Sequence, residues 1–108
     1  MANNFKLKTK ASVGVTTTNV YVVPASTTTT VIGITLANVS GAGINVGVGV
    51  TRASSDDIKL LKNAPLPQGS SLEFMAGNKV VLEATDTLTV DSDANNSVDT
   101  ALTIMEIT

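Results

Sequence analysis

The stretch S-G-A-G-I-N-V-G-V-G-V, residues 40–50, is the most informative about the fold of this chain. In its second part Ile44, Val46, Val48 and Val50 occupy every second position. Alternation with a period of two is typical of a half-buried β-strand. Branched side chains are also stiff at the first torsion and suit a pleated sheet better than a helix. The stretch therefore predicts a strand that follows a glycine-rich turn.

The glycines of this stretch do not fit a nucleotide-binding loop. A dinucleotide fingerprint requires G-x-G-x-x-G between a strand and a helix, whereas Gly41, Gly43 and Gly47 follow a spacing one residue too long. A helix is also excluded after them, because each interior glycine costs about 1 kcal/mol relative to alanine. We instead expect a hairpin turn at residues 41–43 in which glycine supplies a positive φ.

Asn45, Gly47 and Gly49 share the strand face opposite the valines, so that face consists almost entirely of backbone. Interior strand glycines often mark a bulge or the close approach of another backbone. Two interpretations remain open. The three residues form a flat surface on which a neighbouring subunit lies, or they mark a bend or bulge within the chain.

The same alternation recurs along the chain between clusters of turn-forming residues. Further strands are expected at residues 5–10, 20–23, 31–38, 58–62, 71–75, 79–84, 87–91 and 98–107. In residues 31–38 the alternation places Ile32, Ile34 and Leu36 on one face. Short strands spaced by about 8–12 residues are typical of sandwiches and barrels. The sequence predicts an all-β protein, a single antiparallel β-sandwich of the jelly-roll or Ig-like kind with about eight to nine short strands.

Composition limits the chemistry of the chain. It has 108 residues, no cysteine, no histidine and a net charge of -2, so disulfides, thiolate sites and the usual general base are missing. No run of about 18 apolar residues suggests a membrane span, and the N-terminus lacks the apolar stretch of a signal peptide. We expect a protein made in the cytoplasm, with no cofactor, no membrane contact and no enzymatic activity.

One acidic loop imitates part of a calcium site. Its four oxygen-bearing candidates are Asp91, Asp93, Asn95 and Asp99. A calcium-binding EF-hand loop also requires glycine at position six and glutamate at position twelve, where this chain has Asn96 and Leu102. We therefore predict a polar hairpin tip and no metal site.

The other acidic residues and the few aromatic ones are expected to be structural. The carboxylates checked as acid–base pairs are Asp56 with Asp57, Glu83 with Asp86, and Glu73, all at turns or strand ends. Glycosidase chemistry needs two carboxylates across a cleft, and nothing in the pattern predicts such a cleft. The three aromatic residues, Phe5, Tyr21 and Phe74, lie in apolar strand settings and are expected in the core.

The N-terminal residues 1–10 form an arm or an edge strand, and residues 11–108 form the sandwich. Phe5 and Leu7 alternate with Lys6, Lys8 and Lys10, so the two sets lie on opposite faces of a strand. We expect these five residues to contact another protein. Lysine on an edge strand also guards against unwanted strand pairing, and with so few aromatics to stack bases a nucleic-acid partner is not expected.

Two longer segments resemble a known family. Residues 20–41, V-Y-V-V-P-A-S-T-T-T-T-V-I-G-I-T-L-A-N-V-S-G, resemble a signature of small virion structural proteins of tailed bacteriophages, including phages of marine cyanobacteria. L-L-K-N-A-P-L-P-Q-G-S-S-L-E (residues 60–73) and G-N-K-V-V-L-E-A-T-D-T-L-T-V (residues 77–90) extend the resemblance. Within them Gly69 is expected to close a turn and Asp86 to cap another.

The resemblance implies a compact β-sandwich located on the virion, and it brings no catalytic residues. By this resemblance the chain is expected first to be a capsid decoration (cement) protein that contacts the major capsid protein or other virion proteins. It also implies a homo-oligomer, with a trimer favoured. A neck, collar, tail or fibre component is the alternative within this class, and a carbohydrate-binding module is the alternative outside it.

Overall fold

The computed structural model describes residues 3–53, 56–73 and 79–108. They form nine β-strands, which confirms the all-β prediction. The strands are β1 (Asn3–Val13), β2 (Thr18–Val22), β3 (Thr28–Asn38), β4 (Ile44–Thr51), β5 (Ile58–Leu66), β6 (Ser71–Glu73), β7 (Val80–Leu82), β8 (Thr87–Ser92) and β9 (Val98–Ile107). Nowhere in the described ranges is there a helix long and apolar enough to cross a membrane.

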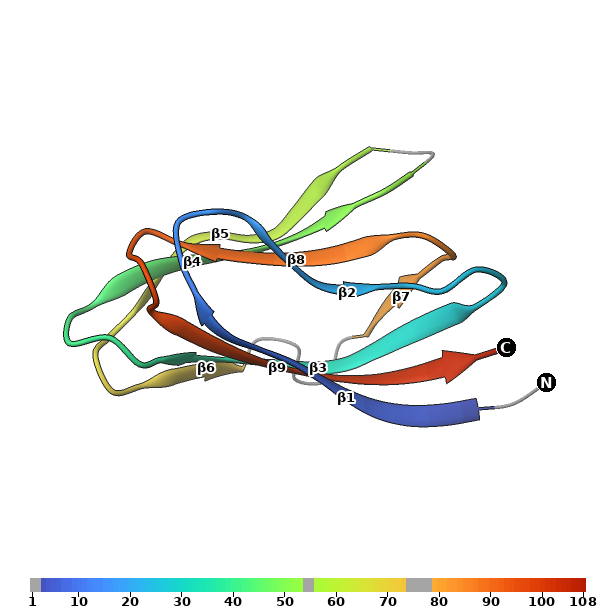
Figure 1. The fold of residues 1–108 in the computed structure, drawn as a ribbon, viewed down its shortest axis with the longest axis horizontal. Helices are drawn as coiled ribbons and strands as arrows, with labels where there is room; N and C mark the ends of the chain where they lie inside the picture. The colour runs from blue at the N-terminus through green and yellow to red at the C-terminus, as the bar shows by residue number, and fades with distance from the viewer. Residues whose placement is uncertain (1–2, 54–55, 74–78) are drawn as a thin grey trace.

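The strands form two antiparallel sheets that pack face to face, as Figure 1 shows. Sheet A has the order β1-β9-β3-β6, with β7 also paired to β3, and sheet B has the order β2-β8-β4-β5. The predicted β-sandwich is confirmed. Because β6 and β7 pair with two different parts of the same edge of β3, they occupy one strand position between them. Each sheet therefore has four strand positions.

The connections identify the sandwich as a jelly roll. The chain passes to the other sheet after β1, β2, β3, β5, β7 and β8, while β4 and β5 form a hairpin within sheet B. Eight strand positions in two sheets joined in this way are the jelly-roll arrangement, whereas an Ig sandwich joins more of its neighbours within one sheet.

The core lies between the sheets and consists mainly of valine, leucine and isoleucine. The valine face predicted for residues 44–50 is confirmed, since Ile44, Val46, Val48 and Val50 are all at most 5% exposed. Strand β9 supplies the facing side through Val98, Leu102 and Ile104, which are completely buried. Fully burying a side chain of this size stabilises a fold by about 1.5–3 kcal/mol, so this face holds the two sheets together.

Two local predictions are wrong. Ile32 does not share the buried face of Ile34 and Leu36, because the register of β3 against β9 shifts between Val31 and Gly33 and leaves Ile32 half-exposed in a bulge. The turn at residues 41–43 is not a hairpin, because it joins sheet A to sheet B and has no positive φ.

Side-chain hydrogen bonds shape that turn instead. The amide nitrogen Nδ2 of Asn38 donates to the carbonyls of Ala42 and Leu66, at 2.8 and 3.0 Å. Its oxygen Oδ1 accepts from the backbone nitrogen and hydroxyl of Ser40. The side chain therefore replaces the backbone pairing that a hairpin would supply.

Two other turns form as predicted. Gly69 has a φ of +72°, and the backbone nitrogen of Ser70 donates to the carbonyl of Pro67 at 3.2 Å. This is the turn position at which glycine carries the positive φ without steric cost. In the second turn the Asp86 carboxylate accepts from the backbone nitrogen of Glu83 at 2.9 Å, as its capping role requires.

Candidate protein-interaction surface

Strand β1 lies at one edge of sheet A, and β6 and β7 lie at the other. It pairs with β9 from Asn3 opposite Ile107 to Lys10 opposite Thr100, and the register then shifts before Val13 meets Val98. In this irregular part Ser12 has a φ of 57°, and its backbone nitrogen donates to Asp99 Oδ1 at 2.9 Å. Residues 1–10, expected as an arm or an edge strand, therefore lie alongside β9 from Asn3 onward.

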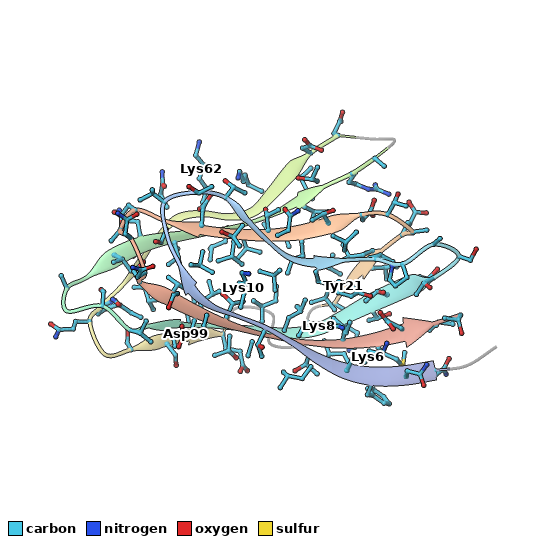
Figure 2. All side chains as sticks on the ribbon, viewed as in Figure 1. Lys6, Lys8, Lys10, Tyr21, Lys62 and Asp99 are labelled. Carbon is cyan, nitrogen blue, oxygen red and sulfur yellow. The ribbon has the colours of Figure 1, made fainter. Side chains whose placement is uncertain are left out.

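The lysines of β1 point toward the other sheet. Figure 2 shows Lys6, Lys8 and Lys10 on the side of the strand that faces sheet B, with Tyr21 of β2 near Lys8. The Nζ atom of Lys8 lies 6.0 Å from the centroid of the Tyr21 ring, within range of a cation–π attraction. The Nζ atom of Lys6 lies 2.7 Å from Oε1 of Glu106.

Glu106 is the centre of a polar network between the sheets. Only 4% of the residue is exposed, and its second carboxylate oxygen accepts a hydrogen bond from the Tyr21 hydroxyl. That hydroxyl also shares a hydrogen bond with Oγ1 of Thr29, at 2.8 Å. The network thus joins β1, β2, β3 and β9, which means that it ties the edge strand to both sheets.

Burial and hydrogen bonding within this network determine the protonation states of Tyr21 and Glu106. Burial, then the hydrogen bond to Glu106, raises the pKa of Tyr21 to about 12. The hydrogen bond from Lys6, followed by that from Tyr21, lowers the pKa of Glu106 below its usual value. At neutral pH the carboxylate is therefore ionised and the phenol is protonated, so each oxygen of Glu106 has a donor.

The opposite face of β1 points away from the sandwich and is apolar. Phe5 is 73% exposed and Leu7 is 64% exposed, so the prediction that Phe5 lies in the core is wrong. The core prediction is correct for Tyr21, which is 6% exposed. Because its ring is buried, Tyr21 does not provide the exposed aromatic surface that a carbohydrate-binding module needs. The prediction for Phe74 lies outside the described residues.

Phe5 belongs to a row of outward-facing residues that crosses sheet A. It lies opposite Met105 of β9, which lies opposite Thr30 of β3, which in turn lies opposite Val81 of β7. Val81 is 60% exposed. Adjacent strands are about 4.8 Å apart, so these residues form one continuous patch and not scattered surface hydrophobics.

Farther along the same face the side chains become small, and the surface is hollowed. A depression of about 320 Å³ lies over β1, β9 and β3. Small residues make up most of its lining, namely Thr9, Ala11, Thr35, Ala37, Thr100 and Ala101, and two charged residues, Lys10 and Asp99, complete it. Thr9 lies opposite Ala101, and Ala101 lies opposite Thr35, so this second row is parallel to the row of Phe5.

We call the outward side of sheet A, from the Phe5 row to this depression, the outer face. Sequence reasoning identified Phe5 and Leu7 on it but missed Met105, Ala101 and Val81. Within residues 98–107 the odd positions point outward and include three apolar residues. These apolar residues at odd positions, in addition to the buried ones at even positions, were the sequence signal that could have revealed the outer face.

Asn45, Gly47 and Gly49 do not form a bare surface for a neighbouring subunit. Both glycines are buried, and a Cβ at Gly47 would lie 2.6 Å from Oδ1 of Asp91. The register of β4 against β5 shifts twice beside them, because β5 carries extra residues. The structure therefore has the bulge, the second of the two interpretations, and only Asn45 of the three is exposed.

Three of the four metal candidates, Asp91, Asp93 and Asp99, bind different parts of the fold. Asp91 accepts from the Thr17 hydroxyl and lies 3.9 Å from the Lys59 ammonium, Asp93 accepts from the backbone nitrogen of Asn45, and Asp99 accepts from that of Ser12. Across residues 3–53, 56–73 and 79–108, no three acidic side chains are grouped so that they could hold a metal ion. The loop is also not a hairpin tip, because it joins β8 of sheet B to β9 of sheet A.

Three of the remaining acidic residues surround an arginine that sequence reasoning did not single out, whereas Glu73 on β6 accepts a hydrogen bond from the Thr35 hydroxyl at 3.2 Å. The guanidinium of Arg52 contacts Asp86 at 3.2 Å and also Glu83. Its backbone nitrogen donates to Asp57 at 3.0 Å. Glu83 and Asp86, considered above as an acid–base pair, are therefore both paired with one cation. This group ties the end of β4 to the turn before β8.

Comparisons with known proteins add a structural neighbour. No protein-family model matches the sequence, and no curated protein matches it. A solved structure described by the words "Bacillus endospore appendages form a novel family of disulfide-linked pili" is similar, with a TM-score of 0.59 at 15% sequence identity. The match covers 99% of this chain and 87% of that chain. At this identity the likeness shows a shared fold.

Proposed function

We propose that this chain is a structural subunit that acts through protein–protein contacts in a larger assembly. The outer face carries this proposal, because Phe5 and Leu7 are 73% and 64% exposed beside Met105 and Val81 on a largely apolar face. Contiguous apolar patches on folded proteins mark interaction sites. The structural neighbour supports the same role, since it is described as part of a family of pili.

The finer proposal is a virion component of a tailed bacteriophage, in first place a capsid decoration protein bound to the major capsid protein. It rests on the sequence resemblance of residues 20–41, 60–73 and 77–90. A neck, collar or tail position is the alternative within the virion. The disulfide linkage described for the neighbouring pili has no counterpart in this chain, which contains no cysteine.

The test is to find the chain in cells that make it naturally. Virions purified after induction, appendages sheared from the cell surface and the remaining soluble protein are analysed separately by mass spectrometry. We expect the chain in the virion fraction, in amounts proportional to the major capsid protein. Recovery with sheared appendages would keep the structural role and overturn the virion assignment, and recovery only as free soluble protein would overturn both.

A further inference from the structure

The outer face carries a projection and a hollow side by side. Phe5 and Met105 form the projecting row, and Thr9 with Ala101 marks the row at the hollow, four residues away on both strands. With about 3.3 Å per residue the two rows are about 13 Å apart. Leu7 and its partner Thr103 lie halfway between them.

This spacing is self-complementary. A twofold axis that lies in the plane of the face, runs across the strands and passes near Leu7 would exchange the two rows between two copies. A twofold interface requires that each residue pair occurs twice, and here the Phe5 row of each copy would cover the hollow of the other. Because both features lie on one side of sheet A, a single partner copy can cover both.

The area of the face is sufficient for a stable pair. Strand β9 has ten residues, which at about 3.3 Å each give a length of about 33 Å. Four strand positions at about 4.8 Å give a width of about 19 Å. The fourth position is described only for the six residues of β6 and β7, so each copy offers about 570 Å². Two copies together bury about 1,150 Å², which is above the roughly 1,000 Å² expected of a biological interface.

The edge of β1 is protected against strand pairing, so a contact on this side of sheet A uses the face of the sheet and not its edge. Inward-pointing lysines and a bulge are devices by which edge strands avoid pairing with another chain. Lys6 and Lys8 point toward sheet B, where they contact Glu106 and the Tyr21 ring, and the strand is irregular between Lys10 and Val13. Face-to-face packing of two sheets requires no free backbone groups.

We propose that the outer face of sheet A is the contact surface of a twofold homodimer in which the Phe5 row of each copy fills the hollow beside Ala101 of the other. The inference rests on the proposed structural role, because it takes the partner to be protein. It replaces the trimer favoured by the sequence resemblance with a pair of copies.

Single cysteines test the symmetry directly, because the chain has none of its own. We expect Leu7→Cys to form a disulfide-linked dimer on mild oxidation, since the axis brings two copies of residue 7 together. Phe5→Cys and Thr9→Cys should each stay unlinked alone and link to each other when mixed, because the same axis places residue 5 of one copy opposite residue 9 of the other. Val22→Cys is the matched control, at a position that is 52% exposed on sheet B and should stay unlinked throughout.

Analytical ultracentrifugation of the unmodified chain gives the second measurement. We expect a dimer at micromolar concentration, and Phe5→Ser or Ala101→Arg should weaken it by roughly tenfold or more, while Val22→Ser leaves it unchanged. Circular dichroism confirms that each variant is folded. A monomer or a trimer, a dimer insensitive to both outer-face changes, or equal cross-linking at residues 7 and 22 would overturn the proposal.

The outcome is separable from that of the proposed function. A monomeric chain that still purifies with virions would overturn the dimer alone. A dimer found only as free soluble protein would overturn the structural role alone.

Discussion

Replacing Lys6 with methionine tests whether the Glu106 network ties the edge strand to the sandwich. The change removes the ammonium group but keeps an unbranched apolar side chain of similar length. Glu106 then remains 4% exposed with one fewer donor, at a position where the Lys6 Nζ atom lies 2.7 Å from its carboxylate. The Tyr21 hydroxyl continues to donate to the other oxygen.

The expected loss lies between the values for buried and for surface ion pairs. Removing one partner of a buried pair costs about 3–5 kcal/mol, whereas exposed pairs contribute about 0–1 kcal/mol. Because the Lys6 side chain is 44% exposed, solvent screens part of the interaction. We therefore expect Lys6→Met to lower the free energy of unfolding by about 1–2 kcal/mol. This corresponds to a fall in Tm of about 4–10 °C.

The pH dependence provides an independent check. The pKa of Glu106 is lowered in the folded state, chiefly by the Lys6 hydrogen bond. A lowered pKa contributes stability that is present above the unfolded value of about 4.3 and is lost as pH falls through the folded pKa. The difference in stability between the unmodified chain and Lys6→Met should therefore be full at pH 7 and shrink below about pH 4.

Urea unfolding at several pH values measures this difference, and Lys62→Met is the matched control. Lys62 is exposed on β5, and no described carboxylate forms an ion pair with it. A double-mutant cycle with Glu106→Gln isolates the pair, and we expect a coupling energy of about 1 kcal/mol. A coupling of zero within error, or a Lys6→Met effect no larger than that of Lys62→Met, would refute this role of the network.

Four further outcomes are expected. Gly47→Ala should destabilise the fold by about 1–3 kcal/mol in urea unfolding, because its Cβ would lie 2.6 Å from Oδ1 of Asp91 on β8 and 3.3 Å from the carbonyl oxygen of Leu61 on β5. Gly41→Ala, with open space around it, should change stability by less than about 0.5 kcal/mol. Thr100→Val should raise stability by about 1 kcal/mol, because the Thr100 hydroxyl is buried without a hydrogen-bond partner among the described residues; an unchanged or lower Tm would contradict this. Deleting residues 1–10 should leave a β-type circular dichroism spectrum with a lower Tm and no dimer, and loss of that spectrum would show that β1 is needed for folding. Thermal melts in EDTA and in millimolar calcium should agree within error, and a rise of several degrees in calcium would indicate a metal site, since a ligand that binds only the folded state stabilises it.

Local sequence pattern was sufficient to predict most of the strands. Strands β4 and β9 begin and end at the predicted residues, 44–51 and 98–107. Strand β4 carries a strict alternation of branched apolar residues, and β9 places Val98, Leu102 and Ile104 at alternate-face spacing, because the side chains of a strand point alternately to its two faces. The turns at Gly69 and Asp86 were predictable for a similar reason, because a positive φ or a capping carboxylate is a property of the turn itself.

Only the tertiary structure decided which face of β1 is covered. The alternation of Phe5 and Leu7 with three lysines is plain in the sequence, and hydrophobicity alone would place the two apolar residues inside. The structure does the reverse, because Glu106 and Tyr21 meet from strands 85 residues apart and provide a buried partner for Lys6. A period of two shows that a strand has two faces, but which face is buried depends on the residues that distant strands place opposite it.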